Sequence, residues 1–204
     1  MQTRAERTKQ EIFSAAEQEF AEKGFYGARM DVIAENSGAN KASIYKYYTD
    51  KENLYREVFY NVYDRFSIEE QILCENTGLS WREKIRRFIR LDFNFLAENP
   101  TYVRLLMWEN LNHGKAYKAR GVYKPKERIL QGLENIIKEA SKECKPCTTV
   151  TAENLLQTVY GCGFNYFTNM DTLSGVLGKD LSNPKVMNER IEAVSDMVIA
   201  YLGG

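Results

Sequence analysis

The chain has 204 residues, of which 44% are hydrophobic and 27% are charged, and its 28 basic residues balance its 28 acidic residues. This composition excludes a disordered or low-complexity chain, and the length allows one large domain or two small ones with a buried core. Neither an apolar run of membrane-spanning length nor a secretion signal is found, so we expect no membrane partner. With four cysteines and no such signal, we expect a cytoplasmic protein with reduced thiols.

Apolar residues recur at helical spacing along the chain, which predicts an all-α fold of about nine helices. In the first helix, Ile12, Ala16 and Phe20 share one face, and Gly24 is expected to end it. Glycine and proline indicate loops at residues 115–126 and 173–182. The expected helices are residues 3–23, 30–36 and 41–47, a long helix from Thr49 past Phe66, and then 81–98, 101–112, 125–142, 151–170 and 184–202.

The most informative pattern is MDVIAENSGANKASIYKYYTDKENL, which runs from Met30 to Leu54. Two short helices flank Gly38, where a left-handed backbone is favourable only for glycine, and Asn40 is a natural N-cap for the second helix. Ile33 and Ile44 supply an inward apolar set. A helix pair of this kind places its second helix in the major groove of DNA. The pattern therefore predicts a DNA-binding regulator.

The exposed face of the second helix is expected to contact DNA. With Ile44 and Tyr48 facing inward, a rotation of about 100° per residue turns Ala42 and Lys46 outward. Ala42 permits close approach to base edges, and Lys46 reaches a base edge or a phosphate. A lysine- and tyrosine-rich face is also typical of an ordinary solvated surface, so that alternative stays open. The predicted DNA-binding residues are Arg29, Lys41, Ala42, Ser43, Tyr45, Lys46, Tyr47 and Lys51, with Ser43, Tyr45, Tyr47 and Lys51 on phosphates.

Residues 8–55 resemble the N-terminal domain of the TetR/AcrR-type transcriptional repressors. The resemblance rests on the pair Ile33-Ala34, on Gly38, on the run Ala42-Ser43-Ile44-Tyr45-Lys46-Tyr47-Tyr48 and on Lys51-Glu52-Asn53-Leu54. There is one departure. That family usually has Thr or Ser just before the Met-Asp of the second helix, whereas this chain has Ala28-Arg29. We interpret Arg29 as a substitute phosphate contact, because arginine binds phosphate bidentately.

The resemblance implies a DNA-binding domain at residues 1–49 and a helical effector-binding and dimerisation domain at residues 50–204. It also implies a homodimer that binds a pseudo-palindromic double-stranded operator and releases it when a small-molecule effector binds. His113 is the only histidine, and the chain has no nucleophile elbow, phosphate-binding loop or metal-helix motif. We therefore expect neither an enzyme activity nor a cofactor.

Candidate effector-pocket residues lie on three of the later predicted helices. Asp92 falls within an apolar stripe, where a carboxylate is costly unless it is paired, so a core ion pair is the alternative to a ligand contact. Aromatic and methionine-rich stripes are also typical of an ordinary core. Around a cavity they would favour a flat or lipophilic effector. The candidates are Phe88, Asp92, Met107, Trp108, Asn110, Tyr160 and Phe164.

The last two predicted helices are candidates for the dimer interface, because two such helices from each subunit form a two-fold four-helix bundle. Burial of the same stripes within one subunit is the alternative. The candidate interface residues are Leu155, Val159, Cys162 and Tyr166 on one helix and Ile191, Val194, Val198 and Leu202 on the other.

A second functional hypothesis arises from Cys144 and Cys147, which form a CxxC pair. Such pairs serve redox chemistry or metal binding, so a redox- or metal-responsive repressor is the alternative to an effector-responsive one. Zinc would need further ligands, and the pair lacks the strand-to-helix context of thioredoxin-like proteins. An incidental loop pair is the interpretation that we prefer, and no metal site is predicted.

Overall fold

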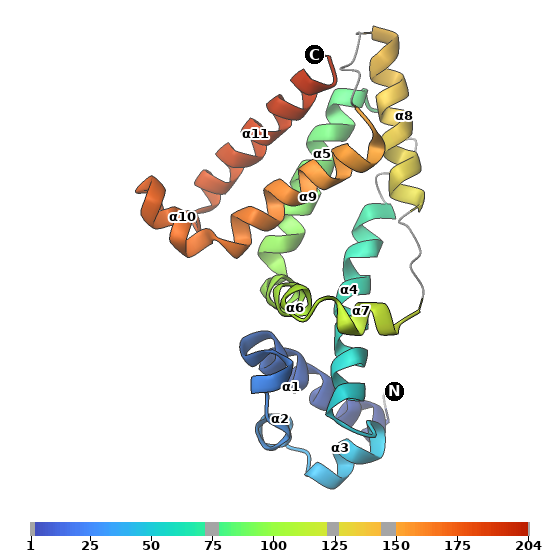
Figure 1. The fold of residues 1–204 in the computed structure, drawn as a ribbon, viewed down its shortest axis with the longest axis vertical. Coiled ribbons are helices and arrows are strands. Elements are labelled where there is room, and N and C mark those ends of the chain that lie inside the picture. Colours follow the sequence, from blue (N-terminus) through green and yellow to red (C-terminus); the bar gives the residue numbers. More distant parts are fainter. Residues whose placement is uncertain (1–2, 72–77, 122–126, 144–149, 204) are drawn as a thin grey trace. The chain divides into compact units, whose positions relative to one another are not determined.

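The computed structural model describes residues 3–71, 78–121, 127–143 and 150–203, and their regular structure is entirely helical (Figure 1). The all-α prediction is confirmed, but the count of about nine helices is wrong, because the described residues form eleven. Among these helices, none is long and apolar enough to cross a membrane. The helices are α1 (Arg4–Gly27), α2 (Met30–Ser37), α3 (Lys41–Tyr47), α4 (Lys51–Gln71), α5 (Trp81–Glu98), α6 (Pro100–Leu111), α7 (Lys115–Ala119), α8 (Glu127–Glu143), α9 (Ala152–Thr168), α10 (Met170–Leu177) and α11 (Pro184–Tyr201).

Two short helices, α7 and α10, lie where glycines had indicated loops. A helix as short as α7 is not stable by itself, and a side chain from α6 supports it: the carboxylate of Glu109 accepts the backbone N–H of Tyr117 at 3.0 Å. At Asn169 the backbone leaves the helical conformation, so the predicted helix 151–170 ends at Thr168, and α10 begins at Met170. Gly178, in the left-handed conformation, ends α10.

The chain divides into two compact units, which are described separately. The N-terminal unit comprises residues 1–65 and 100–123, and the C-terminal unit comprises residues 66–99 and 124–204. The first holds α1 to α3, most of α4, α6 and α7; the second holds α5 and α8 to α11. These units are defined by how the helices pack. The predicted boundary between a DNA-binding domain at residues 1–49 and an effector-binding and dimerisation domain at residues 50–204 is a statement about function, and it stays a prediction.

In the N-terminal unit, α6 packs along α1. The indole N–H of Trp108 donates to the carbonyl of Ala21 at 3.2 Å, and its ring lies directly against Gly24. Glu17, buried on the same helix, binds the guanidinium of Arg65 through both oxygens at 2.7 and 3.0 Å and accepts the hydroxyl of Thr101 at 2.6 Å. This network joins α1, α4 and α6 by charge-assisted hydrogen bonds, which are stronger than neutral ones.

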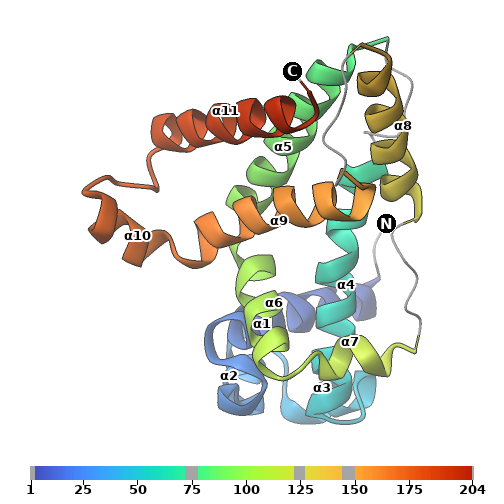
Figure 2. The ribbon, with the colours of Figure 1, turned by 45° about the horizontal axis from the view of Figure 1, so that its top comes forward.

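The C-terminal unit is built around α5, which packs against α8, α9 and α11 (Figures 1 and 2). Trp81 and Phe88 of α5 are 2% exposed, and the core also takes apolar residues from the three other helices. Ser80 and Glu83 form a capping box at the start of α5. The indole N–H of Trp81 donates to Glu143 of α8 at 3.0 Å, so the start of α5 is held against the end of α8.

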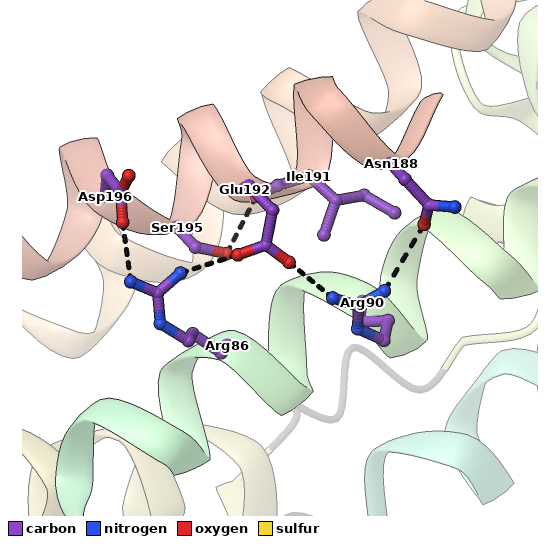
Figure 3. Close-up of polar contacts among 7 residues, drawn as sticks. All are labelled: Arg86, Arg90, Asn188, Ile191, Glu192, Ser195 and Asp196. Carbon is purple, nitrogen blue, oxygen red and sulfur yellow. Dashed lines mark hydrogen bonds and ion pairs between the residues drawn. The ribbon is translucent and has the colours of Figure 1, made fainter. Parts of the chain in front are cut away.

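A ladder of charged side chains joins α5 to α11 on the surface of the C-terminal unit (Figure 3). Arg86 binds Glu192 at 2.8 Å and Asp196 at 2.6 Å, while Arg90 binds Glu192 and also donates to Asn188 at 3.3 Å. These side chains are all partly exposed, so each pair contributes at most about 1 kcal/mol. The carboxylate of Glu192, which both arginines share, contributes little to stability but helps to fix the register of α5 against α11.

Candidate DNA-binding site

The turn between α2 and α3 is the left-handed glycine turn that the sequence predicted. Gly38 has φ +65° and ψ 9°, and its N–H donates to the carbonyl of Glu35 at 3.2 Å. After it, the side chain of Asn40 accepts the N–H of Ser43 at 2.7 Å and caps α3, as predicted. The turn and the cap together fix where α3 begins and the direction in which it leaves α2.

The orientation of α3 follows from its buried residues. Ile44 is 0% exposed and Tyr48 is 3% exposed, so this side of the helix faces the core of the N-terminal unit. On the other side, Ala42, Tyr45 and Lys46 are exposed, while Ser43 and Tyr47 are half-buried beside them. Figures 1 and 2 show α3 at the edge of this unit, away from α6. The solvent-facing stripe is thus small, hydroxyl-bearing and basic, and α3 carries no acid; contact of its residues with DNA stays a prediction.

Lys41, at the start of α3, lies beside an acid of α2. Its ammonium is 2.5 Å from a carboxylate oxygen of Asp31, and this hydrogen bond raises the pKa of Lys41. Both side chains are largely exposed, and the pair is therefore weak and easily exchanged for another anion. A DNA phosphate is one such anion, so the predicted role of Lys41 is compatible with the pair and stays a prediction.

Lys51, predicted to bind phosphate, also stabilises the DNA-binding head (helices α1 to α3). Its ammonium donates to the carbonyl of Ala28 and lies 5.0 Å above the ring of Phe25. Burial lowers the pKa of Lys51, and the nearby charge of Glu19 opposes that effect. The side chain therefore fastens the start of α4 to the α1–α2 turn. Its contact with DNA stays a prediction.

Glu19 is a site residue that the sequence reasoning missed. It is 7% exposed, and its Oε1 accepts the backbone N–H of Arg29, the N-cap residue of α2, at 2.9 Å. The Arg29 side chain makes no capping hydrogen bond and is exposed, as a phosphate-binding role would require. The acid of α1 thus anchors the start of α2, where the usual hydroxyl residue is missing. The signal was its spacing, seven residues after Ile12 on the buried face of α1.

The predicted effector-pocket residues fall in both units. In the C-terminal unit, the rings of Phe88 and Tyr160 are 6.2 Å apart, Asp92 is 3% exposed and lies against Gly163, and Phe164 is partly buried on α9. The other three belong to α6 in the N-terminal unit: Trp108 packs on α1, whereas Met107 and Asn110 are exposed. Trp108 therefore has a structural role in its own unit, and the effector role of the whole set stays a prediction.

The two stripes predicted for the dimer interface are largely buried inside the C-terminal unit. Seven of these eight residues are between 0% and 5% exposed, and Cys162, a free thiol, is half-buried. They form one core with α5 and α8, which is the alternative that the sequence had left open. A dimer that uses α9 and α11 must therefore use their opposite faces. Cys144 and Cys147 lie outside the described residues.

The left-handed turn, the capped α3 and its acid-free face define a helix-turn-helix protein of the class that binds DNA. Residues 12–58 match the family model described as "Bacterial regulatory proteins, tetR family", and residues 82–198 match "Tetracyclin repressor-like, C-terminal domain". The second match covers more than half of the chain. The chain belongs to the TetR family of transcriptional regulators.

Individual relatives agree with this assignment. The HTH-type transcriptional repressor NicS of Pseudomonas putida is 24% identical over 199 residues, 97% of this chain and 93% of that protein. A TetR-like regulator from Rhodococcus sp. RHA1 superposes with a TM-score of 0.65 at 20% identity, covering 99% of this chain and 96% of that one. FadR from Bacillus subtilis, solved with stearoyl-CoA, superposes with a TM-score of 0.59 at 18% identity, covering 92% and 97%. The two structures share the fold.

Proposed function

We propose that this protein is a homodimeric, ligand-responsive repressor that binds a pseudo-palindromic operator through α3. The observation that carries the proposal is the exposed stripe of Ala42, Tyr45 and Lys46 on a capped helix without an acid. A helix with a small residue and a lysine outward can approach base edges closely, while neighbouring hydroxyls hold phosphates. Two copies would place their α3 helices in successive major grooves, about 34–36 Å apart.

Within this proposal, residues divide by role. Ala42 and Lys46 lie at base edges and set the preferred sequence. Ser43, Tyr45, Tyr47, Lys41, Lys51 and Arg29 bind phosphates and set the affinity and its salt dependence. Arg29 is exposed at the start of α2. Because the buried carboxylate of Glu19 already accepts its backbone N–H, the guanidinium is the group of Arg29 that would bind a phosphate.

We propose a flat or lipophilic effector that binds in the C-terminal unit. Support comes from the aromatic rings around Tyr160, which lies 5.2 Å from Phe66 and 6.2 Å from Phe88, ring centre to ring centre. FadR, which shares the fold, was solved with stearoyl-CoA, a ligand with a long apolar chain. An apolar lining with few polar groups selects ligands of that character. Calorimetric titration against lipophilic, aromatic and highly charged metabolites tests this, and tight binding confined to the charged ones would refute it.

The test of the main proposal is selection of bound DNA from a random pool, followed by sequencing. We expect a two-fold symmetric motif with half-sites about one helical turn apart. Selection of no motif, or of one without two-fold symmetry, would contradict the proposal. The neighbouring genes of the selected operator in the genome would then indicate the regulated pathway.

A further inference from the structure

A small cavity lies within the N-terminal unit, where the end of α1, the start of α4, the end of α6 and α7 meet. Figures 1 and 2 show α7 beside α4 and directly after α6. The cavity opens to solvent, and its inner space of about 20 Å³ holds one group of the size of a water molecule. None of the residues predicted to contact DNA or the effector lines it. It is therefore a separate candidate for a binding site.

The buried part of the lining contains a carboxylate without a counter-ion. Glu109 is 2% exposed, its Oε2 accepts the hydroxyl of Tyr55 at 3.0 Å, and its Oε1 accepts the backbone N–H of Tyr117 at 3.0 Å. Burial, and after it the charge of Glu109, raises the pKa of Tyr55, whose hydroxyl thus stays protonated as a donor. Both donors are neutral, and among the described residues no cation pairs with Glu109. A buried charge is costly unless it is paired, and each carboxylate oxygen still has a lone pair for a further donor.

The outer part of the lining is aromatic and carries charges of both signs. The rings of Phe25 and Tyr26 lie 5.2 Å apart at 79° to each other, and Tyr26 is 77% exposed. Such a ring attracts an organic cation through its π face. Glu52 and Lys115 are 3.5 Å apart and neutralise each other. Arg56 is half-buried, and no acid of the described residues forms an ion pair with it.

The charges and the size of the cavity select one chemical class of ligand. Glu109 places a negative charge at the buried end, while Arg56 adds a positive charge nearer the opening. A primary ammonium is close in size to water and brings three N–H donors, so it fills the inner space and uses the remaining lone pairs. A quaternary ammonium has no N–H and is too large. A metal ion would need further oxygen ligands, and no group of three or more potential metal ligands is found among the described residues.

We propose that this cavity binds the ammonium group of a small primary amine or amino acid, with Glu109 as its counter-ion. The rest of the ligand points toward the opening, past the ring of Tyr26. If the ligand is an amino acid, its carboxylate binds Arg56 through charge-assisted hydrogen bonds. The site belongs to the N-terminal unit, so it is distinct from the lipophilic effector site proposed for the C-terminal unit and does not depend on it.

Calorimetric titration of the full chain with ethylammonium, tetramethylammonium and potassium, each as the chloride at constant ionic strength, tests the class of ligand. We expect ethylammonium to bind with a dissociation constant on the order of 1 mM, which is the affinity that so few atoms can supply. The other two cations should bind at least about 10-fold more weakly, because they bring no N–H donors. Similar affinity for all three, or no binding of ethylammonium or alanine, overturns the proposal. Alanine also distinguishes the two sources: tighter binding than ethylammonium, lost in Arg56→Gln, identifies an amino acid, and any other binding identifies a simple amine.

Variants test the residues of the site. Glu109→Gln should weaken ethylammonium binding about 10-fold or more, because the counter-ion is lost, and its thermal unfolding is measured to establish that it folds. Tyr26→Leu changes an exposed side chain, leaves the fold intact and should weaken binding about 2- to 5-fold through the loss of the ring. Glu57→Gln, at an exposed acid of α4 outside the cavity, is the matched control and should bind as the wild type does. A folded Glu109→Gln with wild-type affinity overturns the proposal, and if that variant does not fold, wild-type affinity in Tyr26→Leu overturns it instead.

Discussion

The carboxylate of Glu19 on α1 accepts the backbone N–H of Arg29, the residue that precedes α2. The bond crosses the turn between the first two helices of the DNA-binding head. Lys51 fastens the same turn from the other side through the carbonyl of Ala28. The position of α2, and through Gly38 that of α3, therefore depends on an acid of α1 that has no role of its own at the proposed DNA surface.

Replacing Glu19 should weaken the head. We expect Glu19→Ala to lower the free energy of unfolding by about 1–3 kcal/mol, because the backbone N–H of Arg29 loses the buried carboxylate that accepts it. Adding Arg29→Thr should recover about 1 kcal/mol, since threonine caps a helix through its own hydroxyl. Thermal unfolding measures both, and Glu22→Ala, an exposed acid of the same helix, is the control. No recovery in the double variant would show that Glu19 does not serve as a cap.

Lys46 should determine part of the operator sequence. We expect Lys46→Ala to weaken operator binding by about 1–3 kcal/mol if a base contact is lost, with relaxed preference at one position in each half-site. A loss that is uniform across sequences, with a smaller salt slope, would instead assign Lys46 to a phosphate. Gel-shift titrations on single-base operator variants separate the two. Lys185→Ala on α11 is the control; Lys51→Ala is less clean, because Lys51 also fastens the head.

Gly24 should tolerate no side chain. Its φ of +64° and ψ of 178° are accessible to glycine almost alone, and a Cβ there would lie 2.7 Å from the ring of Trp108. We expect Gly24→Ala to cost about 2–5 kcal/mol in unfolding free energy, from strain and overlap together. Gly38→Ala is matched in φ but meets nothing within 4 Å, and should cost only about 1–2 kcal/mol. Equal losses in denaturant unfolding would show that Trp108 contributes nothing.

The hydroxyl of Tyr48 is buried and has no hydrogen-bond partner in the part of the chain that the structure describes. Burial, together with the charge of Glu57, raises its pKa. Tyr48→Phe should therefore raise the free energy of unfolding by about 1 kcal/mol, because it removes a desolvated polar group. Tyr166→Phe removes a hydroxyl that donates at 2.6 Å and should lower it by a similar amount. Thermal unfolding shifts of the same sign would contradict this reasoning.

Two glycines of α9 should respond in opposite ways. A Cβ on Gly163 would overlap Oδ2 of Asp92 and lie 3.1 Å from Leu96, so Gly163→Ala should cost about 1–3 kcal/mol. Gly161 has open space and sits in a helix interior, where alanine is favoured by about 1 kcal/mol. Calorimetry at a concentration where the chain is monomeric measures the free energy of unfolding of both variants and tests this prediction. A stabilised Gly163→Ala would mean that Asp92 moves at little cost.

Helical periodicity predicted most of the DNA-binding head. It predicted that Ala42 and Lys46 face outward and that Ile44 and Tyr48 face inward. The left-handed backbone conformation at Gly38 was predicted from the residue type alone. What it could not supply is which surface covers an apolar stripe. The stripes of α9 and α11 were candidates for a subunit interface, with burial inside one subunit as the alternative, and residues of α5 and α8 in the same chain pack against them.

The sequence also does not show which group a buried polar residue supports, even where its spacing places it on a buried face, as for Glu19. The acceptor for the N–H of Arg29 lies ten residues away on another helix, and Glu109 of α6 accepts the backbone N–H of Tyr117 in α7. Such contacts depend on how helices cross, which local spacing does not encode. The glycines around α7 and α10 predicted loops because helix propensity depends only on residues near in sequence. It takes no account of contacts from residues that are distant in sequence, which can stabilise a short helix.

The two tryptophans of the chain are divided between its two compact units, Trp81 in the C-terminal unit and Trp108 in the N-terminal unit. Their surroundings differ: Trp81 is 2% exposed with the guanidinium of Arg82 4.1 Å from its ring, whereas Trp108 is half-buried against the backbone of α1. Removing either one leaves a native fluorophore that reports on a single unit. Fluorescence changes during titration with DNA or with candidate effectors can therefore be followed in each unit separately, without an attached dye.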